Sequence, residues 1–134
     1  SKTRNRSKNF LLGGIVAVVN EFKFFGVDDV TSSAAQTMFG TSTVAGVATQ
    51  NPLINETYIV KSLKVTSAGT PTVTVTNNSI TTIKTAALTA NVTQELLTQP
   101  LIVEGNTTLT VTSSTTDSFD VAISYLNIKK ERLD

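Results

Sequence analysis

The sequence predicts an all-β protein, an antiparallel β-sandwich or jelly-roll with an extended N-terminal arm. First, 47 of the 134 residues are β-branched: 24 Thr, 15 Val and 8 Ile. These side chains are stiff at the first torsion and suit a pleated sheet better than a helix. Second, six or so short segments alternate between apolar and polar residues, with turn signals between them. Third, no stretch sustains the period of an amphipathic helix.

The first nine residues, 1–9, form a basic arm. They carry four positive charges and no negative one, on Lys2, Arg4, Arg6 and Lys8. The other residues sum to −3, because the whole chain carries +1 and the arm +4. The arm is either a solvated tail or a segment that lies on an acidic partner surface. Nucleic acid is the weaker choice of partner, because no aromatic side chain interleaves the basic residues.

Residues 10–55 are expected to form an extended or irregular segment with one strand-like apolar run. Alternation within this run places Phe22 and Phe24 on one face, and Phe25 on the other. These three phenylalanines either belong to the core or anchor the chain in a neighbouring subunit, where aromatic side chains concentrate. Residues 31–51 show little periodicity, which predicts a long loop or an extended segment that wraps a neighbour.

Residues 56–128 are expected to form the β-sandwich domain. The clearest strand is 72–76, in which the valines point inward and the threonines outward. In 80–87 the isoleucines are out of phase, which predicts a bulge or a short break. A central strand cannot contain a proline, so the strand around Pro100 is broken or lies at an edge. Further strands are expected at 56–66, 91–97, 101–103, 107–112 and 119–128, followed by a charged tail at 129–134.

The side chains that carry most catalytic and metal chemistry are missing. The chain has no Cys, no His and no Trp, so it has no thiolate nucleophile and no imidazole base. Asp28 and Asp29 are adjacent, and in an extended chain they point to opposite faces. Asp117 and Asp120 flank a turn, but a calcium site needs more oxygen ligands. We therefore expect no enzyme, no catalytic residue, no cofactor and no metal.

No apolar run reaches about 18 residues, so we expect no transmembrane helix and no membrane partner.

Five segments carry a resemblance to a known module. They are Tyr58–Thr66, Thr72–Val75, Glu95–Leu97, Pro100–Thr112 and Val121–Leu126. Together they resemble a β-sandwich module common in the virion proteins of tailed bacteriophages, over about residues 56–128. Such modules occur in capsid decoration proteins and in tail, neck or fibre components. The resemblance implies a virion protein and leaves its position in the virion open.

The function expected from the sequence is that of a non-enzymatic structural component of a bacteriophage virion. A capsid decoration (cement) protein that stabilises the shell is the leading form. The alternatives are a tail, neck or fibre protein, or a receptor- or carbohydrate-binding sandwich. The expected partners are other virion proteins, first the major capsid protein, and further copies of the chain, for which a trimer suits a three-fold position. The interface candidates are Lys2, Arg4, Arg6, Lys8, Phe22, Phe24 and Phe25.

Overall fold

Most of the strands coincide with alternating or continuously apolar stretches of the sequence. The computed structural model describes residues 15–40, 52 and 55–133. Within these ranges the regular elements are all strands, and none is a helix that could span a membrane. They are β1 (Ile15–Val30), β2 (Gln36–Phe39), β3 (Glu56–Ser67), β4 (Thr72–Asn77), β5 (Ile80–Ala87), β6 (Gln94–Glu95), β7 (Leu101–Glu104), β8 (Leu109–Ser113) and β9 (Phe119–Leu133).

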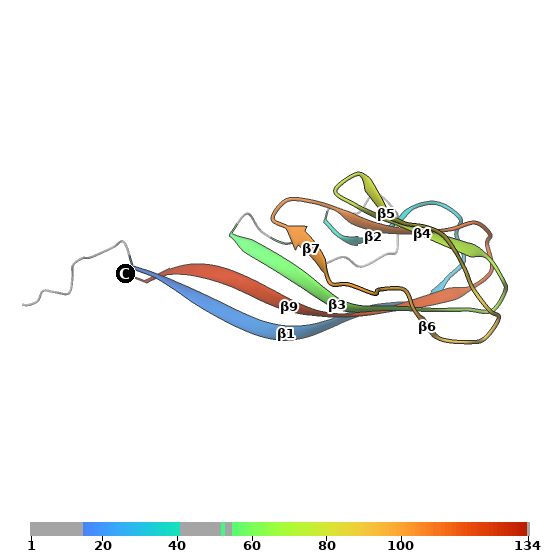
Figure 1. Cartoon of the computed structure of the whole chain (residues 1–134), viewed down its shortest axis with the longest axis horizontal. Coiled ribbons are helices and arrows are strands. Elements are labelled where there is room, and N and C mark those ends of the chain that lie inside the picture. The colour runs from blue at the N-terminus through green and yellow to red at the C-terminus, as the bar shows by residue number, and fades with distance from the viewer. Residues whose placement is uncertain (1–14, 41–51, 53–54, 134) are drawn as a thin grey trace, which may run out of the picture.

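These strands form two antiparallel sheets that pack against each other, which confirms the predicted all-β sandwich (Figure 1). Sheet A has the order β1-β9-β3, and the short strands β6 and β7 both pair with the far edge of β3. Sheet B has the order β2-β8-β4-β5. Sequence neighbours are often not sheet neighbours, so most of the packing is decided by contacts distant in the chain.

The core lies between the sheets and follows the predicted alternation. Val73 and Val75 on β4 are fully buried, and the alternating threonines Thr72, Thr74 and Thr76 are half-buried on the opposite face. The Phe39 ring of sheet B packs edge-on against the Tyr58 and Tyr125 rings of sheet A, with centroids 5.0 Å apart in both pairs. Aromatic pairs favour such edge-to-face geometry. Each fully buried large apolar side chain contributes about 1.5–3 kcal/mol to stability.

The sandwich includes residues that the sequence placed outside it. β1 and β2 lie within 10–55, the segment expected to be extended or irregular, yet each is an edge strand of a sheet. β2 lies within the expected loop 31–51, whose residues 41–51 are outside the described residues. With only four residues, β2 is too short to show a period, and its pairing with β8 decides its conformation.

The charged residues 129–133 continue β9 instead of forming a separate tail. They pair with residues 15–19 of β1, from Val19 opposite Lys129 to Ile15 opposite Leu133. β3 begins only at Glu56, opposite Lys129, so β1 and β9 extend beyond it as a two-stranded ribbon (Figure 1). A ribbon without a third strand tolerates charged side chains, which explains why this stretch resembles a tail in sequence.

Two local predictions are confirmed. The pairing of β4 with β5 shifts register near Val75, as the out-of-phase isoleucines of 80–87 indicated. Pro100 separates β6 from β7, and both strands lie at the edge of sheet A.

Candidate functional site

The outward faces of the two sheets differ in chemistry. On sheet B, threonines of adjacent strands stand opposite one another, Thr74 opposite Thr112 and Thr76 opposite Thr110. Such pairs expose hydroxyl groups without charge. On sheet A, one line of outward positions carries large apolar side chains. The outer face of sheet A is therefore the candidate functional site.

Four apolar residues form a line across the outer face of sheet A. Phe22 of β1 stands opposite Leu126 of β9, which stands opposite Ile59 of β3. Ile59 in turn stands opposite Ile102 of β7. Residues directly opposite in an antiparallel ladder share a face, so the four side chains are neighbours. We call Phe22, Leu126, Ile59 and Ile102 the apolar row.

The two ends of the apolar row are open to solvent. Phe22 is 84% exposed and Ile102 is 58% exposed, whereas Leu126 and Ile59 between them are half-buried. Isolated apolar side chains are common on protein surfaces, but a contiguous exposed patch marks an interaction site. The geometry supports adhesion to another surface.

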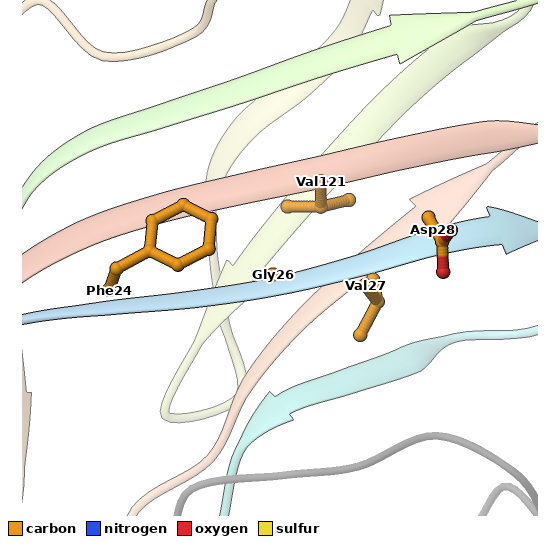
Figure 2. Close-up of a pocket in the computed structure, with 5 residues that line it drawn as sticks. All are labelled: Phe24, Gly26, Val27, Asp28 and Val121. Carbon is orange, nitrogen blue, oxygen red and sulfur yellow. The ribbon is translucent and has the colours of Figure 1, made fainter.

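Phe24 and Val18 enlarge this patch along β1. They share the face of Phe22 and are 69% and 59% exposed. The Phe24 ring lies over Gly26, where an added Cβ would come within 3.0 Å of the ring (Figure 2). Gly26 thus leaves room for the ring to lie along the strand. A shallow, open depression of about 260 Å³ adjoins it, lined by Phe24, Gly26, Val27, Asp28 and Val121.

Phe25 is directed away from this surface. It is only 6% exposed and packs against Phe39 of sheet B, with ring centroids 5.9 Å apart. The three phenylalanines predicted as interface candidates therefore separate: Phe22 and Phe24 are on the surface, and Phe25 is in the core. The other candidates, Lys2, Arg4, Arg6 and Lys8, lie outside the described residues.

The aspartates considered as catalytic acids or metal ligands act as hydrogen-bonding groups in this structure. The Asp29 amide donates to the Asp120 carboxylate at 2.8 Å, and the Ser118 hydroxyl donates to the Asp29 carboxylate at 2.7 Å. The Asp117 carboxylate accepts from the Thr115 hydroxyl at 2.9 Å. Among the described residues, no three acidic side chains cluster as a metal site would require.

A polar and aromatic layer lies behind the apolar row, on the inner face of the same strands. Asn127 donates to the Glu56 carboxylate at 3.0 Å, and both residues are buried. The pKa of the Tyr58 hydroxyl is raised to about 12, mainly by burial and in addition by the charge of Glu56 and by the neighbouring Tyr125. These side chains connect β3 and β9 on the inner face of sheet A, behind the apolar row.

Three members of the apolar row were not identified from the sequence. Each lies in an apolar run that does not alternate: Ile59 between Tyr58 and Val60, Ile102 between Leu101 and Val103, and Leu126 next to Tyr125. An antiparallel strand with one wet face alternates, so a continuous apolar run indicates that both faces become covered. That signal could have located the row.

Comparison with known proteins identifies no family for the chain. No family and no curated protein matches the sequence. One solved structure with a similar chain is the cyanophage Pam1 capsid asymmetric unit, with 19% sequence identity and a TM-score of 0.33. The similarity covers 93% of this chain and 94% of that chain. At this identity and TM-score the similarity establishes neither a family nor a function.

Proposed function

We propose that the chain is a non-enzymatic structural component of a bacteriophage particle, and specifically a capsid decoration protein. The single observation that carries the proposal is the apolar row on the outer face of sheet A. The resemblance of residues 56–128 to a module of tailed-phage virion proteins supports the choice of partner. In this proposal, the row docks on a neighbouring virion protein while the threonine face of sheet B remains in solvent.

The physical task of such a protein is to add buried contact across the joints of a shell. Each large apolar side chain that is removed from water contributes about 1.5–3 kcal/mol before the costs of association are subtracted. Phe22 and Ile102 retain most of this contribution for a partner because they are more than half exposed. The basic arm 1–9 would add attraction to an acidic neighbour.

The copy number in purified particles tests this function. Quantitative mass spectrometry of virions whose genome encodes this chain would compare its abundance with that of the major capsid protein. A decoration protein is expected at a copy number of the same order as the shell subunit. A copy number in the tens or fewer would contradict decoration and favour a tail, neck or fibre component. Absence from the particle would contradict both.

A further inference from the structure

β1 has a long edge that lacks a strand partner among the described residues. It is 16 residues long and, within residues 15–40, 52 and 55–133, pairs only with β9, in an unbroken register from Ile15 to Val27. An exposed strand edge presents unpaired backbone groups and acts as a template for another strand. Proteins usually block such edges with prolines, bulges or charges. Residues 15–27 contain no proline, and their only charged side chains are Glu21 and Lys23.

These two charges are arranged so that they complement a second copy of the same edge. We propose that two copies of this chain associate through β1, antiparallel, about a twofold axis at Phe22. In this register Glu21 stands opposite Lys23 of the second copy, and Lys23 opposite its Glu21. Phe22 stands opposite its own equivalent. Opposite charges directly across an antiparallel pair are stabilising. The same two charges that discourage pairing with other strands therefore favour pairing with β1 of a second copy.

The packing around β1 fits the same register. The pairing would run from Ala17 opposite Val27 to Val27 opposite Ala17, and so would use the regular part of the strand and end before its irregularity. Sheet B covers the inner face of β1 at Phe25, whereas residues 15–18 extend beyond the start of β3. The covered part of each copy would lie beside the uncovered ribbon of the other.

The pairing also brings aromatic side chains of the two copies together on the outer face of sheet A. Phe22 would meet Phe22 of the second copy, with Phe24 diagonal to it, forming a cluster of four rings. Diagonal neighbours on one face are within reach of aromatic side chains. The exposure of Phe22 and Phe24, 84% and 69%, would fall on association. The two apolar rows would join into one line across both sheets A.

Sedimentation equilibrium of the purified full chain tests the association and its register. We expect a concentration-dependent species of twice the 14.2 kDa chain mass. Glu21→Lys or Lys23→Glu alone creates like-charge pairs at two symmetric places and should weaken dimerisation about tenfold. The combined swap Glu21→Lys with Lys23→Glu should restore it. Lys84→Glu, an exposed reversal on β5, is the matched control and should leave dimerisation unchanged.

Disulfide trapping tests the position of the twofold axis. The chain has no Cys, so Phe22→Cys introduces a single thiol. At the axis the two Cβ atoms would be about 5 Å apart, close enough for a disulfide after small adjustment. Phe24→Cys is the matched control, because residue 24 lies opposite residue 20 and its equivalents would be about 13 Å apart. We expect a covalent dimer from Phe22→Cys only.

Three outcomes would overturn the inference: a monomer at all concentrations, a trimer, or a combined swap as weak as either single reversal. Equal trapping at positions 22 and 24 would also overturn it. All of these measurements use the purified chain alone. Their failure is therefore distinguishable from failure of the proposed role in a particle.

Discussion

Phe24 and Phe25 are adjacent in the chain and have the same side chain, but they occupy opposite environments. Phe24 is 69% exposed on the outer face of sheet A, and Phe25 is 6% exposed between the sheets. The alternation of a β-strand is the cause, because successive side chains point to opposite faces. The pair therefore provides a natural comparison between a surface role and a core role at one place in the fold.

Replacing each of these phenylalanines with alanine should separate the two roles. Phe25→Ala removes a ring packed against Phe39 and should lower the free energy of unfolding by about 3–5 kcal/mol. Phe24→Ala should lower it by about 0.5 kcal/mol or less, because the ring is mostly in solvent. Urea denaturation followed by circular dichroism measures both. Equal losses would show that β1 is packed differently.

The titration of Tyr58 is coupled to folding. Burial raises the pKa of its hydroxyl to about 12, and Glu56 and Tyr125 act in the same direction. Burial also raises the pKa of Tyr125, with the charges of Glu56 and Glu21 adding to it. The folded state thus holds these protons more tightly than the unfolded state, in which the pKa is about 10.

The free energy of unfolding should therefore decrease at alkaline pH. The contribution of Tyr58 is complete below about pH 10 and disappears as the pH rises toward about 12. The variant Tyr58→Phe with Tyr125→Phe keeps both rings and removes both titrations. When the pH is raised from about 9 to about 11.5, the urea midpoint of unfolding should fall less in this variant than in the parent chain. An identical fall in the two proteins would contradict the coupling.

At the scale of elements, the strand ladder along the far edge of β3 is interrupted, and the Glu95 side chain forms hydrogen bonds with β3 at that point. β7 pairs with residues 57–60 of β3 and β6 with residues 64–65, which leaves a gap between them. The Glu95 carboxylate accepts from the Ser62 hydroxyl and from the Leu63 amide, the latter at 2.8 Å. The same carboxylate accepts from the Leu97 amide at 3.3 Å. It therefore replaces missing backbone partners.

Glu95→Gln should weaken this edge and change its response to acid. Burial alone would raise the pKa of the Glu95 carboxyl, but the hydrogen bonds from Ser62, Leu63 and Leu97 and the charge of Lys64 lower it overall. A lowered pKa gives stability that is present at neutral pH and is lost as the pH falls through the folded-state value. The variant should be less stable by about 1 kcal/mol at pH 7.

Glu104→Gln, an exposed change on β7, is the control for the Glu95 prediction. The stability difference between Glu95→Gln and the parent chain should be smaller at about pH 3 than at pH 7, because the contribution of the parent carboxylate is lost as the pH falls through its lowered folded-state pKa. Urea denaturation at the two pH values measures it. A difference that is the same at both would mean that the charge of Glu95 contributes nothing.

At the scale of the whole molecule, the contrast between the two outer faces predicts which one attaches to a particle. Ile102→Lys places a charge at one end of the apolar row and should weaken attachment to decoration-free shells by about tenfold or more. The control is Thr81→Lys on the outer face of sheet B, where Thr81 is exposed and stands opposite Thr76. Co-sedimentation with the shells measures attachment. Equal loss in the two variants would exclude the apolar row as the docking face.

Much of the fold was predictable because local patterns decide it. The strands at 56–67, 72–77, 80–87 and 109–113 follow alternation and turn chemistry within a few residues. Two parts were not predictable. β2 has no local period. The charged residues at the end of β9 form a strand because β9 runs back antiparallel beside β1. Of the candidate site, Phe22 and Phe24 were identified, whereas Ile59, Leu126 and Ile102 were not.

The sequence by itself determined that this protein is built of strands, that its reactive chemistry is sparse, and that Phe22 and Phe24 share a face. Composition and a period of two are local properties, so a single chain displays them directly. Only the tertiary structure decided that this face continues through Leu126 and Ile59 to Ile102. Those residues come from strands far apart in the chain. The register in which these strands pair brings the four side chains into one line, and the pattern within a single strand does not show which strand will lie beside it.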